Sequence, residues 1–136
     1  MTSAAPGPAP TDIAAMVPFA GHLGFEVIRC DRDACIVEVT LRPEHCTAGG
    51  TAHGGFLMTL ADFAGAAGAW MVLPEGAKGT TTSDSKTNMI GAAAAGSRLV
   101  ATATPVHIGR RTSVWQTRVT VGDKLISLTM QTQMVL

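Results

Sequence analysis

Hydrophobic and polar residues alternate along two short segments near the start of the chain, at 25–30 (FEVIRC) and 34–41 (ACIVEVTL). A period of two places successive side chains on opposite faces of a β-strand. The residues between the segments, Asp31, Arg32 and Asp33, have the polar composition of a turn. Together the two segments predict a β-hairpin.

The longest apolar run, residues 56–73, has the composition of a helix. Its sequence, FLMTLADFAGAAGAWMVL, is rich in Ala, Leu and Met, and small residues occur on all of its sides. A helix that is apolar on nearly every side must be buried. A shorter helix is predicted within residues 11–20, starting at Thr11 or Asp12 and ending near Pro18.

Beyond Thr80 the chain becomes rich in Thr, Val, Ser and Ile, with glycines between the segments. Gly122 and Asp123 form a two-residue loop suited to a tight hairpin, and GRR at 109–111 supplies another turn. Two strands, one long helix and four strands predict an α+β fold in which a curved antiparallel sheet wraps the helix. The four later strands are expected at 80–90, 97–108, 112–121 and 124–135.

Length and composition narrow the class of protein. A chain of 136 residues, 46% of them hydrophobic, fits a single domain, which we place at residues 11–136. Residues 1–10, MTSAAPGPAP, lack the basic start and apolar stretch of a signal peptide and are predicted to be a flexible arm. A formal net charge of +0 argues against a nucleic-acid partner, and the apolar composition is typical of an oligomer.

The cysteines and histidines do not have the spacing of a metal site. Three cysteines, an odd number, form no C-x-x-C pattern and fit free thiols in a reducing cytoplasm. The apolar run is long enough for a membrane span of ~17–25 residues. However, Asp62 lies near its centre, and no Lys or Arg occurs between Arg42 and Lys78 to set an orientation, so we predict no membrane helix.

Asp62 is the only charged residue of the apolar run. An unpaired carboxylate in apolar surroundings is costly, so a chain that keeps one pairs it, hydrates it or uses it chemically. A carboxylate that caps a neighbouring loop is the structural alternative.

Motifs around Asp62 resemble those of a known family. HGGFLMTLAD at 53–62 has His, Gly and Gly at the helix start and an acid nine residues after the His. The flanking segments that also match are PFAGHLGFEV (18–27), LRPEH (41–45), SDSKTNMI (83–90) and HIGRRTSVW (107–115). Together they resemble the hotdog-fold acyl-CoA thioesterases, above all the phenylacetate-pathway and hydroxybenzoyl-CoA thioesterase group.

The resemblance implies a curved antiparallel sheet around one central helix. It also implies a cytoplasmic acyl-CoA thioesterase that releases free CoA and a carboxylic acid without a metal or cofactor. Members of the family place their sites at dimer interfaces, so a homodimer, or a tetramer built as a dimer of dimers, is expected. The alternative function is a hotdog protein that binds an acyl-CoA or fatty acyl ligand without turnover, whereas a hotdog dehydratase would carry a different Asp and His motif.

Hydrolysis of a thioester needs a group that attacks the carbonyl carbon or activates water, and donors for the charge on the carbonyl oxygen. Asp62 fits the first role, as nucleophile or as general base. The Gly54 N–H is the predicted oxyanion donor, because the first amides of a helix are unpaired and glycine allows close approach. The structural alternative is that both glycines, Gly54 and Gly55, only let the helix enter tightly.

The spacing of these two residues predicts a shared site. Gly54 and Asp62 are eight residues apart, or ~12 Å along a helix that rises ~1.5 Å per residue. This distance is too large for both to contact one carbonyl group. We therefore expect Gly54 of one subunit to face Asp62 of another, with the carboxylate in a hydrated seam between them.

The resemblance implies further site residues, each of which also has an ordinary structural interpretation. His53 would orient the thioester, and Thr47 stands six residues before it, where relatives often have Asn or Gln. Arg110 and Arg111 would bind the phosphates of CoA, since guanidinium groups suit phosphates. The remaining residues assigned to substrate binding are Gly55, Thr81 and Thr112.

Overall fold

The computed structural model of the protein describes residues 10–136. The predicted arm at 1–10 therefore lies outside the described residues, apart from Pro10, where the first helix begins. The elements are α1 (Pro10–Met16), α2 (Pro18–Leu23), β1 (Glu26–Cys30), β2 (Cys35–Thr40), the short 3-10 helix η1 (Pro43–His45), α3 (Gly54–Met71), β3 (Thr80–Met89), β4 (Arg98–Ile108), β5 (Thr112–Val121) and β6 (Lys124–Val135).

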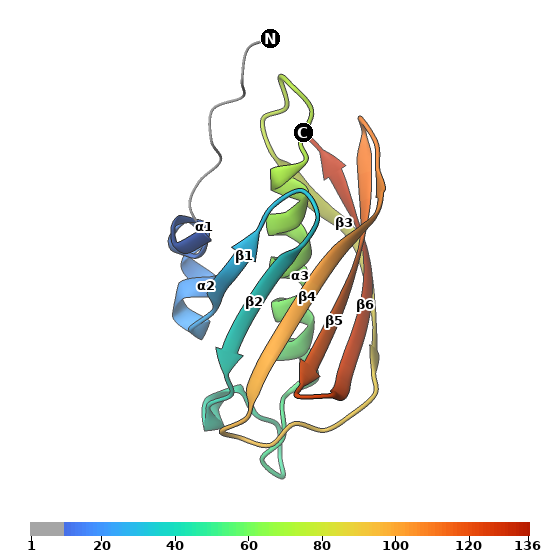
Figure 1. Cartoon of the computed structure of the whole chain (residues 1–136). Coiled ribbons are helices and arrows are strands. Elements are labelled where there is room, and N and C mark those ends of the chain that lie inside the picture. Colours follow the sequence, from blue (N-terminus) through green and yellow to red (C-terminus); the bar gives the residue numbers. More distant parts are fainter. Residues whose placement is uncertain (1–9) are drawn as a thin grey trace.

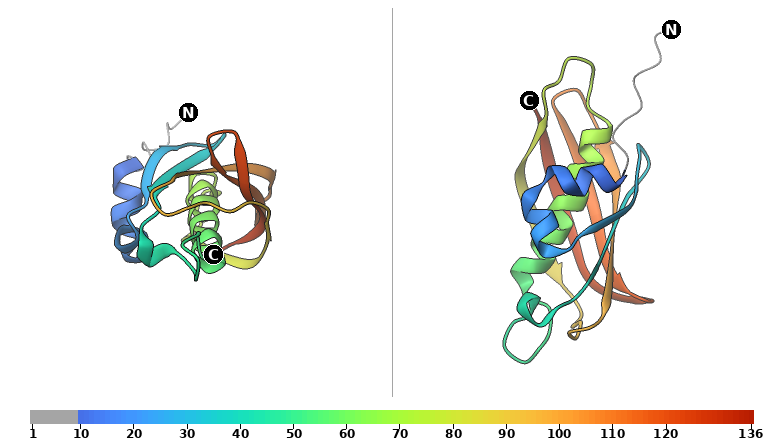
Figure 2. Two further views of the ribbon diagram at one scale, coloured as in Figure 1. Left: turned by 90° about the horizontal axis from the view of Figure 1, so that it is seen from below. Right: turned by 90° about the vertical axis from the view of Figure 1, so that its left-hand side faces the viewer.

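The six strands form one antiparallel sheet in the order β1-β2-β4-β5-β6-β3. The sheet curves around α3, which is seen along its axis in Figure 2 (left). This architecture confirms the predicted hotdog fold. The hairpin turn at Gly122 also matches its prediction, because Gly122 has a φ of 56°, a conformation that glycine adopts at little cost.

The single helix predicted within residues 11–20 is two helices. Pro18 lacks a backbone N–H and fits the first turn of a helix, so α1 stops before it and α2 starts at it. Gly24, with a φ of 81°, ends α2. α1 contacts β1 and, in the right panel of Figure 2, crosses in front of α3. One edge of the sheet is therefore covered, whereas no strand of residues 10–136 pairs with the outer side of the other edge strand, β3.

The core lies between the concave face of the sheet and α3. Close packing depends on small residues of the helix: a Cβ added to Gly68 would lie 2.6 Å from the ring of Trp115, which is fully buried. The described residues cover only part of the helix face turned away from the sheet, and on it Met58 and Trp70 are 41% and 42% exposed. Within residues 10–136 no helix is long and apolar enough to cross a membrane.

Candidate active site

The Asp62 carboxylate lies on the open face of α3 and is held from one side by the sheet. Thr82 on β3 donates its hydroxyl hydrogen to Asp62 Oδ1 at 2.6 Å. Gln131 on β6 donates from Nε2 to the same oxygen at 3.3 Å, and to the Asp62 carbonyl oxygen at 3.3 Å. Asp62 is therefore a half-buried carboxylate with a fixed orientation.

A chain of hydrogen bonds fixes the direction of these donors. The Thr80 hydroxyl donates to Gln133 Oε1 at 3.0 Å, and Gln133 Nε2 donates to the Thr82 hydroxyl oxygen. Since Thr82 has one hydroxyl hydrogen, it donates to Asp62. Both side-chain donors end on Oδ1, and among the described residues none hydrogen-bonds Oδ2. Oδ2 is thus the carboxylate oxygen available to water or substrate.

Gln131 can approach Asp62 only because residue 65 is a glycine. A Cβ added to Gly65 would lie 2.1 Å from Gln131 Oε1, far inside van der Waals contact. Gln131 is 1% exposed, and its Oε1 has no hydrogen-bond partner within the described part of the chain. A buried amide oxygen without a partner is costly, so a packing role alone does not explain this side chain.

Thr82, Gln131 and Gln133 were not predicted as site residues. The expected threonine beside the acid was Thr81, but Thr81 is exposed and it is Thr82 that contacts Asp62. Neighbouring residues of a strand point to opposite faces, so Thr81 faces away from the side on which Thr82 contacts Asp62. A signal for the glutamines exists in β6, where polar residues recur at every second position.

The start of α3 presents a backbone amide. His53 is the N-cap residue, and its Nδ1 accepts a hydrogen bond from the Gly55 N–H at 2.9 Å. The preceding amide, Gly54 N–H, has no acceptor among the residues that the structure describes. Of the two glycine amides, the one predicted to stabilise an oxyanion is therefore the one left available.

A buried histidine anchors this corner. His45 is 4% exposed, its ring stacks on Phe56 at 4.3 Å, and its carbonyl oxygen accepts from the His53 N–H at 3.0 Å. The Arg42 backbone N–H donates to His45 Nδ1 at 3.0 Å. Burial, with a smaller effect from the Arg42 charge, lowers the pKa of His45 below its ordinary value. The corner is therefore held by a neutral ring.

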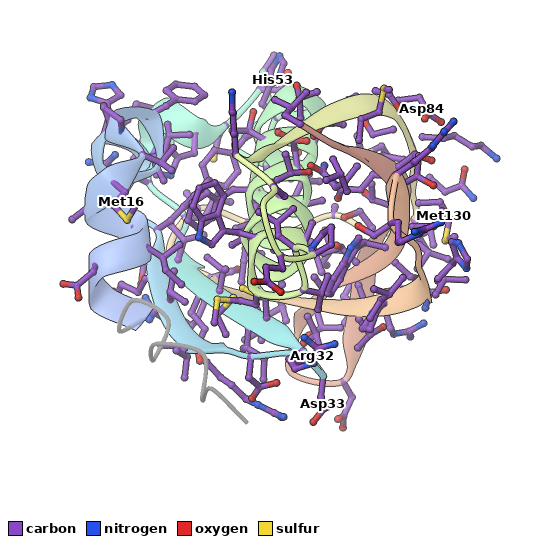
Figure 3. All side chains as sticks on the ribbon, turned by 90° about the horizontal axis from the view of Figure 1, so that it is seen from above. Met16, Arg32, Asp33, His53, Asp84 and Met130 are labelled. Atoms are coloured by element: carbon purple, nitrogen blue, oxygen red, sulfur yellow. The ribbon has the colours of Figure 1, made fainter. Side chains whose placement is uncertain are left out.

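The helix start and the carboxylate do not meet within one chain. Gly54 and Asp62 lie eight residues apart on the same regular helix, or ~12 Å at a rise of ~1.5 Å per residue. Figure 3 shows His53 at the edge of the view opposite Arg32 and Asp33. Thr47 belongs with the helix start: it is exposed in the preceding loop, where its N–H donates to the Thr51 carbonyl at 2.8 Å. The site residues of the chain thus fall into two groups.

The predicted arginine turn, residues 109–111, lies nearer to the residues around Asp62 than to those at the helix start. It connects β4 and β5, and the Arg111 carbonyl accepts from the Val135 N–H at 2.8 Å. Thr112 of β5 pairs with Met134 of β6, and the next residue of β6, Val135, pairs with Thr80 of β3. β6 therefore lies between β5 and β3, and two strand spacings, or ~10 Å, separate these two strands. A polar depression of about 570 Å³ is lined by His107, Gly109, Arg110, Arg111 and Thr112.

The described residues contain no group of three or more His, Cys, Asp or Glu side chains that could hold a metal ion. The arginines of the turn also take part in none of the ion pairs found between described residues. Their guanidinium groups are therefore available to an anionic ligand.

Comparisons with known proteins find a family and several solved structures that the chain resembles. The model of a family described as the thioesterase superfamily matches residues 49–127, which contain the helix start, Asp62 and Thr82. The chain is 31% identical to a variant of the phenylacetic acid degradation protein PaaI from Thermus thermophilus, with 88% of this chain and 100% of that one covered and a TM-score of 0.81.

Two more distant structures show the same fold. A thioesterase from Haemophilus influenzae is 24% identical, with 93% of this chain and 87% of that one covered and a TM-score of 0.83. The PaaI protein from the phenylacetic acid degradation operon of E. coli is 23% identical, with 94% and 96% covered and a TM-score of 0.82. The likeness extends over nearly the whole of each chain.

Proposed function

Because the chain belongs to the thioesterase superfamily and is a thioester hydrolase, we propose that it hydrolyses acyl-CoA to free CoA and a carboxylic acid. The observation that carries this proposal is the Asp62 carboxylate, fixed by Thr82 and Gln131 on an open helix face with Oδ2 free. A carboxylate that only stabilised the fold would not need one oxygen kept free.

The carboxylate has two ways to start the reaction. As a general base, Oδ2 takes a proton from water, and the resulting hydroxide attacks the thioester carbon. As a nucleophile, Oδ2 attacks the carbon itself and forms an anhydride that water then hydrolyses. In both cases the carbonyl oxygen becomes negative, the C–S bond breaks and the thiolate of CoA leaves. The Gly54 N–H at the positive end of the helix dipole stabilises that oxygen.

The oxyanion donor and the carboxylate come from different subunits in this proposal. They are ~12 Å apart along one helix, so a single chain does not complete a site. The open edge of the sheet, β3, and the exposed face of α3 offer a surface for a second copy. We assign the working enzyme to a homodimer or to a tetramer of two such dimers.

Binding residues complete the proposal. Arg110 and Arg111 bind the CoA phosphates from the polar depression at their turn, with Thr112 beside them. His53, Gly55 and Thr47 shape the thioester site from the helix start of one subunit. Thr81, which is exposed on β3, remains a candidate for contact with the substrate. The three free cysteines fit a reducing cytoplasm, where we place the reaction.

The second candidate is binding of acyl-CoA without turnover. It is favoured by Thr47, which replaces the amide side chain common among relatives and makes no hydrogen bond through its hydroxyl to any described residue. A panel of acyl-CoA thioesters with a thiol-detecting reagent separates the two functions. Release of thiol from at least one thioester supports hydrolysis, and a flat response across all of them supports binding alone.

Mixing two inactive variants tests the shared site. Gly54→Pro removes the amide hydrogen, and Asp62→Asn removes the carboxylate charge. A mixed dimer contains one site in which both residues are wild type, so mixing should restore part of the activity. Absence of any recovery, with subunit exchange demonstrated by a tagged subunit, would exclude a site shared in this way.

A further inference from the structure

Two of the three cysteines face each other across the first hairpin. Cys30 ends β1 and Cys35 begins β2, and the two residues are partners in the register of these strands. Both are buried, at 9% and 0% exposed, and both belong to the hydrophobic core. The third cysteine, Cys46, is partnered by Ala52 instead.

The hydrogen bonds of the turn bring the two strands close together at this pair. The Asp31 N–H donates to the Ala34 carbonyl at 3.0 Å, and the Asp31 carboxylate accepts from the N–H groups of Asp33 and Ala34 at 2.8 and 3.1 Å. In an antiparallel ladder the pair next to a hydrogen-bonded pair makes no hydrogen bonds of its own, and its Cα atoms lie ~4.5 Å apart. A disulfide needs ~4.4–6.8 Å between Cα atoms, so the strands already have the required spacing.

We propose that Cys30 and Cys35 form a dithiol site that a hydroperoxide oxidises to an intramolecular disulfide and that a thiol reductant restores. The site is separate from Asp62, and the inference does not rest on the proposed hydrolysis. In a reducing cytoplasm such a bond is transient, which is the way in which cytosolic proteins use disulfides to sense oxidants.

The surroundings of the two thiols give them different roles. The facing Cys35 thiol lowers the pKa of Cys30, and burial and the Asp31 charge oppose it with smaller effects. The same contact, together with burial, raises the pKa of Cys35. Cys30 therefore forms the thiolate, which is the reactive species. Cys30 is also the one of the two with exposed surface, and it lies close in sequence to the exposed Arg32 and Asp33 at the edge of the molecule (Figure 3).

Oxidation proceeds in two steps. The Cys30 thiolate attacks one oxygen of hydrogen peroxide, the O–O bond breaks, and Cys30 becomes a sulfenic acid while hydroxide leaves and takes up the proton that Cys30 lost on ionising. The Cys35 thiol then attacks the sulfenic sulfur, the S–S bond forms, and the sulfenic oxygen leaves as water with the Cys35 proton. Two electrons pass from the sulfurs to the peroxide, which becomes two waters. A dithiol reductant reverses the reaction by thiol–disulfide exchange.

The bond holds one edge of the sheet in place. β1 is the edge strand against which α1 packs, and its register with β2 is irregular between Val27 and Arg29. A disulfide beyond this irregularity joins the end of β1 to β2 and closes the short loop 30–35. Because a short loop loses little entropy on closure, oxidation restricts opening of the hairpin more than it raises the stability of the whole domain.

Oxidation of the full chain by hydrogen peroxide tests the site in the Cys46→Ser background, where Cys30 and Cys35 are the remaining thiols. Trypsin cuts after Arg32, which lies between these two cysteines. After oxidation, the peptide that ends at Arg32 should therefore stay linked to the peptide that carries Cys35, and dithiothreitol should separate them. The intact chain should lose ~2 Da, the mass of two hydrogens, and both thiols should disappear from a titration of the unfolded protein.

Two further variants of this background test the separate roles. Cys35→Ala removes the second thiol, so the sulfenic acid reagent dimedone should label Cys30 at least ~10-fold more than in the parent protein. Cys30→Ala should leave Cys35 unlabelled at the same dose of peroxide, because this thiol is fully buried. Circular dichroism checks that both variants are folded, and if either is not, the peptide map of the parent protein decides the question.

Three results would overturn the inference. The first is that both thiols persist at a dose of peroxide that oxidises free dithiothreitol completely. The second is a disulfide between two chains, seen as a dimer on a non-reducing gel, in place of the bond within one chain. The third is labelling of Cys35 by dimedone in preference to Cys30, which would contradict the assigned roles.

Discussion

Replacing Gly65 with alanine tests how Asp62 is held. The added Cβ would lie 2.1 Å from Oε1 and 2.4 Å from Cδ of Gln131. Gln131 is 1% exposed and packed in the sheet, so it has no free space to turn into. We expect the glutamine to withdraw and to lose its hydrogen bonds to Asp62.

The expected change in stability has a definite sign. Alanine is favoured over glycine inside a helix by ~1 kcal/mol. Against this, overpacking costs ~1–3 kcal/mol, and lost hydrogen bonds to a charged group cost ~1.5–3 kcal/mol when the group is buried, less for a half-buried carboxylate. The steric cost and the lost hydrogen bonds together exceed the gain in helix propensity, so Gly65→Ala should lower the free energy of unfolding by roughly 1–4 kcal/mol.

The second substitution, Gln131→Ala, removes the atoms with which the new Cβ collides. In that background Gly65→Ala should stabilise the protein by up to ~1 kcal/mol, so the effect changes sign between the two backgrounds. Urea denaturation measures this, at one fixed subunit concentration because the protein is expected to be an oligomer. If Gly65→Ala stabilises the wild-type background as well, Gln131 is not held between Gly65 and Asp62.

Three further predictions follow from the contacts of the site. Replacing Arg110 and Arg111 with Ala should raise KM for full CoA thioesters by about 10-fold or more, with much less effect on pantetheine thioesters; equal loss on both would mean that the arginines act structurally. Thr82→Val should lower kcat by about 10-fold and Thr82→Ser should restore most of it, because the serine keeps the hydroxyl that donates to Asp62; equal kcat in the two variants would contradict this role. The unfolded chain binds a proton at His45 with a pKa of about 6.5, whereas the folded pKa is lower, so His45 contributes fully to stability above about pH 6.5 and loses that contribution as the pH falls toward the folded pKa. The urea midpoint should therefore decrease from pH 7 to pH 5, and less so in His45→Gln; a decrease of the same size in the variant would refute the assignment.

The fold was predictable because the period of the sequence changes at the correct places. Alternation with a period of two marked the first hairpin, and the Ala-rich run between 56 and 73 marked the central helix. Because this helix is apolar on nearly every side, the sheet must wrap around it to bury it. Pro18 predicts the end of a helix, and in the structure it also starts α2, since proline fits both positions.

The contacts of Asp62 were harder to predict, because they depend on sheet register. β3 has an irregularity between Thr82 and Asp84, and such a shift changes which side chains face the helix. In β6 the usual pattern is reversed: Gln131 and Gln133 face inward, whereas Met130 and Met134 are 37% and 45% exposed. Hydrophobicity alone would place the methionines inside. The polar period of β6 indicates that the glutamines share one face, and the structure shows that this face is the one turned toward the carboxylate.

Asp62→Asn tests the central claim most directly, because it keeps the shape of the side chain and removes its charge. Turnover is measured by thiol release. Binding is measured by calorimetry with the thioether S-octyl-CoA, which has no thioester bond to hydrolyse. If the Oδ2 oxygen is the catalytic base, kcat should fall by at least ~10² while the variant remains folded and still binds the thioether. Turnover within a few fold of the wild type, with binding unchanged, would show that Asp62 is not the catalytic carboxylate.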